Sequence, residues 1–257
     1  MYRVHRINLI ARAVLRPPFR GLFHLLCRVQ ITGKEHVPKS GSYLIAINHI
    51  SIFEPPFVLA FWPVAPEAVG AVEIWSRSGQ SLLARLYGGI QVHRGEYDRE
   101  MLSQLIEVLR SGKPLLIAPE GGRSHTPGLR RGLPGVAYIV DKVPVPVVPV
   151  GIVGTTDDFF QRAWDFLRTR RGERPVLEMR IGKPLLLTPA EGKGAQRREN
   201  LQVNIDLIMA HIAALLPPDY RGNYAQNAAI ISLHVQPSNL NNRDEPAHQT
   251  TDGISSS

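Results

Sequence analysis

Short apolar runs alternate with segments of helical periodicity along most of the chain. The runs read YLIAIN, IQVH, PLLIAP, VPVPVVPVGIVG and VLEMRI, and each is typical of a strand in a sheet. Apolar residues at helical spacing lie between them, most regularly from Asp98 to Gly112 and again over 201–215. Because strands that alternate with helices pack in layers, the pattern predicts an α/β fold with a layered mixed sheet flanked by helices.

The first thirty residues combine apolar and basic positions, and the pair Pro17-Pro18 divides them. The pattern predicts an N-terminal pair of amphipathic helices, at 4–15 and 19–29. In the second helix the apolar and basic side chains fall on opposite arcs: Phe19, Leu22, Phe23, Leu25, Leu26 and Val29 on one, and Arg20, His24 and Arg28 on the other. Such a pair can lie on an anionic membrane surface, or pack on its own domain with the arginines in water.

The alternating pattern divides the chain into an N-terminal segment (1–30), a main domain (31–221) and a C-terminal segment (222–257). The last is polar and low in large apolar residues, which predicts a disordered tail. No apolar run reaches the roughly 18 residues of a transmembrane helix, and arginines interrupt the N-terminal runs. We therefore expect neither a membrane span nor a secretory signal.

The composition limits the classes of molecule that the protein is expected to bind. The formal net charge of +8 favours anionic lipid headgroups, phosphorylated substrates or nucleic acid. Nucleic acid is not expected, because no binding motif with interleaved aromatic residues is present. The single cysteine, Cys27, excludes an internal disulfide framework, and scattered histidines give no metal-ligand spacing.

Three polar clusters follow apolar runs, where ligands collect in open α/β sheets. The first is Asn48-His49 with Glu54: a neutral imidazole can accept a proton from a hydroxyl while a carboxylate orients it. The two side chains can meet only if the chain turns between them, which Pro55-Pro56 makes plausible. The alternative is a surface histidine beside a carboxylate that stabilises a helix N-terminus.

The residues of the other two clusters are of types that can bind an anion. In PEGGRS adjacent glycines allow close backbone approach, and Arg123 offers a planar fork for phosphate. In GGIQVHRG, Arg94 follows a predicted strand. Read separately, PEGGRS could be an ordinary strand-to-helix turn with solvated charges, and a surface charge is the favoured interpretation of Arg94.

Taken in order, NHISIFEP, HRG, PEGGRS and VPVVPVGIVGT resemble the motifs of the glycerolipid acyltransferase family, which includes the 1-acylglycerol-3-phosphate (lysophosphatidic acid) acyltransferases. The resemblance covers roughly residues 30–216 and implies that 31–221 is a catalytic domain. It implies a peripheral enzyme at the cytoplasmic face of an anionic membrane. The enzyme would move a fatty acyl chain from acyl-CoA or acyl-carrier protein to a lysophospholipid hydroxyl, with no bound cofactor, no metal and no covalent acyl-enzyme.

The resemblance also implies a role for each motif residue. His49 is the general base and Glu54 orients it. Acceptor or phosphate binding falls to Arg94, Glu120, Gly121, Gly122, Arg123 and Ser124. Pro149 belongs to the segment that meets the acyl donor or shapes the pocket.

Two positions depart from the family pattern. Glu54 replaces the usual aspartate, and Ala118 stands where phenylalanine usually precedes the third motif. Two alternatives therefore stay open beside lysophosphatidic acid acylation. They are the same chemistry on a lyso-aminolipid or glycolipid, and a non-catalytic lipid-binding protein of the same fold.

Overall fold

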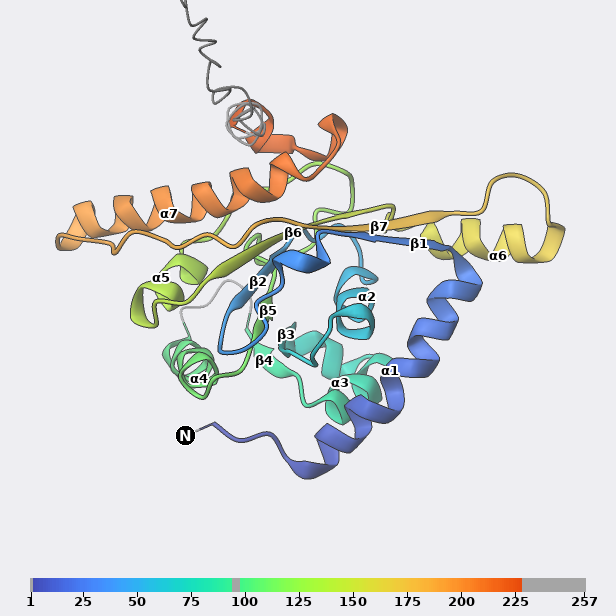
Figure 1. Ribbon diagram of the computed structural model, residues 1–257, viewed down its shortest axis with the longest axis horizontal. Helices are drawn as coiled ribbons and strands as arrows, with labels where there is room; N and C mark the ends of the chain where they lie inside the picture. Colours follow the sequence, from blue (N-terminus) through green and yellow to red (C-terminus); the bar gives the residue numbers. More distant parts are fainter. Residues whose placement is uncertain (1, 94–97, 228–257) are drawn as a thin grey trace, which may run out of the picture.

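The computed structural model describes residues 2–93 and 98–227, and its strands form one sheet in the order β1-β7-β6-β2-β5-β3-β4 (Figure 1). The strands are β1 (Arg28–Thr32), β2 (Leu44–Ile47), β3 (Glu67–Ala71), β4 (Ile90–Val92), β5 (Leu115–Ile117), β6 (Val147–Val153) and β7 (Val176–Ile181). Neighbouring strands run parallel, except that β6 and β7 are antiparallel. The predicted α/β class with a mixed sheet is confirmed.

Helices cover both faces of the sheet, and each face has its own core (Figure 1). One layer contains α1 (Arg6–Leu26), α2 (Glu54–Phe61), α3 (Gln80–Tyr87) and α6 (Phe159–Thr169); the other contains α4 (Arg99–Arg110), α5 (Gly135–Lys142) and α7 (Gly194–Ala214). Strand β2 contributes to both cores: Leu44 and Ala46 to the α7 side, Ile45 and Ile47 to the α1 side. Burial on both faces explains why its sequence is an unbroken apolar run.

Short 3₁₀ turns complete the described chain: η1 (Lys34–His36), η2 (Val72–Ser76), η3 (Pro218–Tyr220) and η4 (Gly222–Tyr224). Strand β3 and helix α6 were not predicted. Strand β3 has a charged residue and a glycine in five positions, so it lacks the apolar run of its neighbours. No described helix combines the length and the apolar character needed to cross a bilayer.

The N-terminal segment is one continuous helix, so the predicted break at Pro17-Pro18 is wrong. Both prolines lack an N–H group for the helical ladder, but both lie on the exposed side of α1. Arg16 and Arg20 flank them and donate through Nε to carbonyl groups in the last turn of α2, at 3.0 and 2.6 Å. Tertiary hydrogen bonds on both sides of the prolines therefore support a continuous helix.

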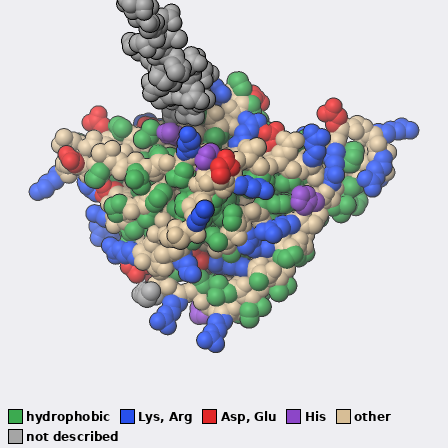
Figure 2. All heavy atoms as spheres, in the orientation of Figure 1, with side chains coloured by type: hydrophobic (Ala, Val, Ile, Leu, Met, Phe, Trp, Pro, Cys, Tyr) green, Lys and Arg blue, Asp and Glu red, His purple; other side chains and the backbone are tan. Residues whose placement is uncertain are grey.

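Helix α1 turns Arg12, Arg16 and Arg20 toward the domain and leaves a row of apolar side chains exposed, whereas the predicted alternatives placed the arginines at a membrane surface or in water. Arg12 is buried, and its guanidinium donates to both carboxylate oxygens of Glu67 at 2.7 Å while lying 4.4 Å from the ring centroid of Tyr87. The outer side is an uncharged row of exposed residues: Ile7, Ile10, Val14, Pro17, Gly21 and Leu25. Figure 2 shows hydrophobic side chains along the lower right edge of the molecule, where α1 runs.

The predicted apolar arc over 19–29 is divided in the same way. Phe19, Phe23 and Leu26 pack inward, whereas Leu22 and Leu25 are exposed. The helix ends at Leu26, and the last residues of the predicted helix belong to β1, which pairs with β7.

Candidate active site

The candidate site lies at one edge of the sheet, where three neighbouring parallel strands end. Strand β2 lies between β5 and β6, and all three point the same way. The carboxyl end of β2 leads to His49, that of β5 to Glu120 and that of β6 to Thr155. This is the edge at which open α/β sheets bind ligands.

His49 and Glu54 meet as the motif predicts, because the chain bends over 50–53. The His49 Nδ1 atom lies 3.0 Å from Glu54 Oε2. The His49 side chain is 13% exposed, and that of Glu54 is fully buried. An ionised carboxylate can only accept a hydrogen bond, so the geometry assigns the proton to Nδ1 and leaves Nε2 free to accept one.

The Glu54 carboxylate folds back over this bend, where its oxygens accept further hydrogen bonds. Its oxygens accept from the backbone N–H groups of Ile50 at 3.3 Å and Ser51 at 3.0 Å. The hydroxyl of Thr155 also donates to Oε1. Glu54 is the first residue of α2, where the helix dipole favours a negative charge. Four donors therefore fix the acceptor that orients His49.

Glu120 supports the backbone of His49 from the other side. Its Oε1 accepts from His49 N–H and its Oε2 from Arg130 N–H, both at 2.8 Å. Burial raises the pKa of the Glu120 carboxyl to about 7, although both backbone N–H groups act in the opposite direction. Both oxygens are already occupied within the chain, so the geometry gives Glu120 a positioning role beside the acceptor role implied by the resemblance.

The glycine-rich loop returns alongside His49. Ser124 N–H donates to the His49 carbonyl at 2.9 Å, and the Ser124 hydroxyl donates to the Thr126 carbonyl at 2.6 Å. Gly121 has a φ of +66°, in the left-handed region that favours glycine. Gly122 is buried beneath Arg130.

Arg123 is half-buried in this loop. Its carbonyl accepts from Arg130, whereas its guanidinium has no hydrogen-bond partner among the residues that the structure describes. An arginine in this state is available to a phosphate oxygen. Arg94 lies outside the described residues.

The segment after β6 reaches the site through a residue that was not predicted. Pro149 lies inside β6, opposite Ala46 of β2. The residue that meets the pair is Thr155, beyond the strand end. Asn48 fixes the two strand ends together, since its side chain exchanges two hydrogen bonds with the backbone of Ile152, at 2.7 and 2.9 Å.

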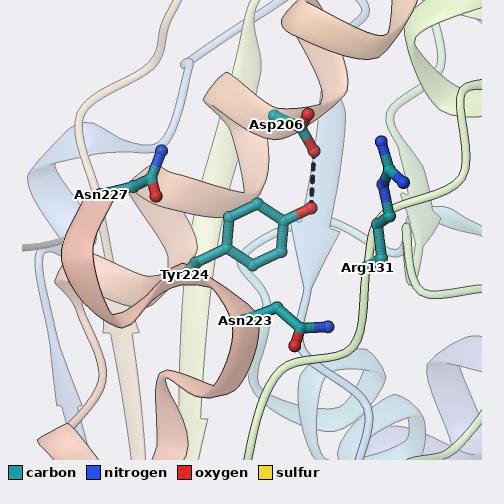
Figure 3. Close-up of a pocket in the computed structure, with 5 residues that line it drawn as sticks. All are labelled: Arg131, Asp206, Asn223, Tyr224 and Asn227. Atoms are coloured by element: carbon teal, nitrogen blue, oxygen red, sulfur yellow. Dashed lines mark hydrogen bonds between the residues drawn. The ribbon is translucent and has the colours of Figure 1, made fainter.

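Two tyrosines from the C-terminal turns hold the loops on either side of the site. Tyr220 accepts from Gly154 N–H at 3.3 Å, next to Thr155. Tyr224 accepts from Gly132 N–H at 3.0 Å and donates to Asp206 at 2.7 Å (Figure 3). Tyr224 is buried, so the predicted disordered tail does not begin at 222.

A pocket with a volume of about 240 Å³ is lined by Arg131, Asp206, Asn223, Tyr224 and Asn227. Figure 3 shows these five residues, with the Tyr224 hydroxyl directed toward Asp206. Because that hydroxyl already joins α7 to the loop at Gly132, its role here is structural. Within residues 2–93 and 98–227, no three His, Cys, Asp or Glu side chains lie together in a way that could hold a metal ion.

The site and the fold together define an acyltransferase domain. Residues 28–153, which include the His49–Glu54 pair and the PEGGRS loop, match the family model described as Acyltransferase. Residues 28–153 therefore form a domain of the acyltransferase family, as the motifs predict.

Among solved structures, the chain is similar to the 1-acyl-sn-glycerophosphate (LPA) acyltransferase PlsC from Thermotoga maritima. The TM-score is 0.52, and the two are 22% identical over 80% of this chain and 83% of that one. At this level of identity the similarity supports the fold.

Proposed function

We propose that the protein transfers a fatty acyl chain from a thioester, acyl-CoA or acyl-carrier protein, to the free hydroxyl of lysophosphatidic acid. The observation that carries this proposal is the His49–Glu54 hydrogen bond, because it leaves Nε2 without a proton at the open edge of the sheet. The half-buried Arg123 lies in the loop that returns alongside His49, and its guanidinium suits the acceptor's phosphate.

The proposed reaction needs no group beyond the two substrates and this chain. Nε2 of His49 takes the proton from the acceptor hydroxyl as its oxygen attacks the thioester carbonyl carbon. The C–S bond breaks, an ester forms, and the departing thiolate takes the proton from the imidazolium. Glu54 stabilises the imidazolium between these two events.

The test is release of free thiol from acyl-CoA and acyl-carrier protein with a panel of lysolipids. We expect release that depends on lysophosphatidic acid and is slower with a lyso-aminolipid or a glycolipid, because only a terminal phosphate gives Arg123 a dianionic partner. Faster release with either of those lipids would reassign the acceptor. No release with any acceptor and either donor would indicate a non-catalytic lipid-binding protein.

We further propose that the protein works as a peripheral protein at the cytoplasmic face of the membrane, with the outer row of α1 in contact with the lipid. This differs from anchoring by basic residues, because Arg12, Arg16 and Arg20 are engaged with the domain. An exposed uncharged row on a helix fixed by its opposite side suits the boundary between headgroups and acyl chains.

Val14→Glu should weaken binding to phosphatidylcholine–phosphatidylglycerol vesicles about tenfold. The substitution removes an apolar contact between α1 and the acyl chains, and it places a charge at the membrane interface. Val14 is 65% exposed, so the fold should be unaffected. The matched control is Val203→Glu, at a similarly exposed position on α7 across the sheet. Cosedimentation with vesicles measures the difference, and equal binding by the two variants would rule out contact through α1.

A further inference from the structure

Helix α6 has a fully packed inner side and an aromatic outer side. Phe159 and Ala163 are buried in the core. On the outer side Phe160 is 51% exposed and Trp164 is 57% exposed. These two rings stack with centroids 6.5 Å apart and an interplanar angle of 14°. Two large rings at i and i+4 therefore form an apolar surface on a helix that needs neither of them for its own packing.

Basic residues continue this surface toward the end of α6. Arg168 follows Trp164 by one turn, and Arg170, Arg171 and Arg174 lie exposed in the connection that follows. Within 165–174 the acids are Asp165 and Glu173, both exposed, against four arginines, so this stretch carries an excess of positive charge. Two further exposed acids, Asp157 and Asp158, lie at the opposite end of α6, where Asp158 pairs with Arg162. In Figure 2, Lys and Arg side chains gather with hydrophobic ones at this end of the molecule.

The same connection is attached to α1. Arg174 donates to the carbonyl of Leu25 at 3.0 Å and to that of His24, at the C-terminal end of α1. Helices α1 and α6 also contact each other, and Figure 1 shows α6 at this end of α1. The aromatic surface of α6 is thus joined to the helix whose outer row is uncharged.

We propose that α6 is a second membrane-contact element, which inserts Phe160 and Trp164 at the headgroup boundary of an anionic bilayer while Arg168, Arg170 and Arg171 meet lipid phosphates. This inference rests on the proposed membrane location of α1. Amphipathic aromatic rings concentrate at this boundary, and arginines beside them are attracted to anionic lipid. The combination of rings, positive charge and continuity with α1 selects a lipid surface over a second copy of the chain.

The contact has a consequence for the site. Helix α6 begins at Phe159, four positions after Thr155, and the Phe159 ring packs edge-on against Phe53 at 5.1 Å. Phe53 directly precedes Glu54. Docking of α6 therefore holds the edge of the sheet that carries His49 close to the bilayer that supplies the acceptor.

Tryptophan fluorescence tests this on the full chain. Trp62 is buried and Trp75 is half-buried, so Trp164 is the most exposed of the three tryptophans. With vesicles of phosphatidylcholine and phosphatidylglycerol, we expect a blue shift and quenching by brominated phosphatidylcholine. Trp164→Phe should remove most of this change and leave cosedimentation intact, whereas Trp75→Phe should retain it.

The double variant Phe160→Glu with Trp164→Glu should weaken vesicle binding by at least about tenfold relative to Val203→Glu. If Val14→Glu loses sedimentation but Trp164 of the unchanged protein gives no response to vesicles, the α6 contact is overturned and the α1 contact still stands. A Trp164 response that follows protein concentration without vesicles would also overturn it, in favour of a second copy of the chain. Neither result depends on thiol release, so the proposed reaction is judged separately.

Discussion

His49→Ala should lower the rate of acyl transfer by about 10²–10⁴-fold, the contribution of a positioned general base to attack by a hydroxyl near neutral pH. The loss follows from the geometry, since Nδ1 of His49 is bound to the buried Glu54 carboxylate and its Nε2 is left free to accept a proton. Thiol release with lysophosphatidic acid measures the rate. The fold should persist, because Glu54 keeps its bonds to Ser51 and Thr155.

His125→Ala is the matched control. His125 lies in the adjacent loop and also faces a carboxylate, with Nδ1 at 3.1 Å from Asp157. Both side chains of that pair are exposed, whereas the carboxylate of the His49–Glu54 pair is fully buried. We expect activity near that of the unchanged protein. A His49→Ala variant that retains near-normal turnover with an unchanged circular dichroism spectrum would remove His49 from the mechanism.

The local elements of the fold could be predicted because local residues determine them. Asp98 opens α4 by accepting from Met101 N–H at 2.9 Å, a bond that spans three residues. The burial of β2 on both faces is visible as an unbroken apolar run. The orientation of α1 could not be predicted in this way. Its periodicity separates two arcs, but the partner that draws Arg12 inward is Glu67, 55 positions away.

The residues of the site also differ in whether local sequence can predict them. His49 and Glu54 are five positions apart, so a motif can hold them, and the bend between them brings them together. Thr155, Tyr220 and Tyr224 act across 101, 66 and 92 positions. They are common residue types in segments without a motif, and no local pattern marks a threonine that will meet a buried carboxylate. The segment around Tyr224 is polar and low in large apolar residues, which predicts a tail, although Tyr224 itself is buried in η4.

Glu54→Ala should abolish most of the activity, with a fall in kcat of about 10²–10⁴-fold, whereas Glu54→Asp should retain activity within roughly tenfold. Alanine leaves Nδ1–H, the Thr155 hydroxyl and two backbone N–H groups without an acceptor in a buried place. The imidazole then loses both its orientation and the charge that stabilises its protonated form. Aspartate keeps the charge and gives up one methylene of reach.

The two Michaelis parameters separate this role from a structural one. Glu54 is fully buried and its oxygens are occupied within the chain, so neither variant should change the KM for lysophosphatidic acid by much. Thr155→Val is the comparison for stability: it removes one donor from Glu54 and leaves the His49–Glu54 bond in place. Its melting temperature should fall, and its kcat should stay far above that of Glu54→Ala.

Equal rates for Glu54→Ala and Glu54→Asp would show that the carboxylate does not act on His49. The contrast between them also bears on the departure from the family's aspartate. In this chain the longer side chain starts from the first residue of α2 and reaches back over the bend to the N–H groups of Ile50 and Ser51. If aspartate restores most of the rate, the acid's charge at Nδ1 matters more than its exact reach, and the glutamate reflects the local shape of the bend rather than a different reaction.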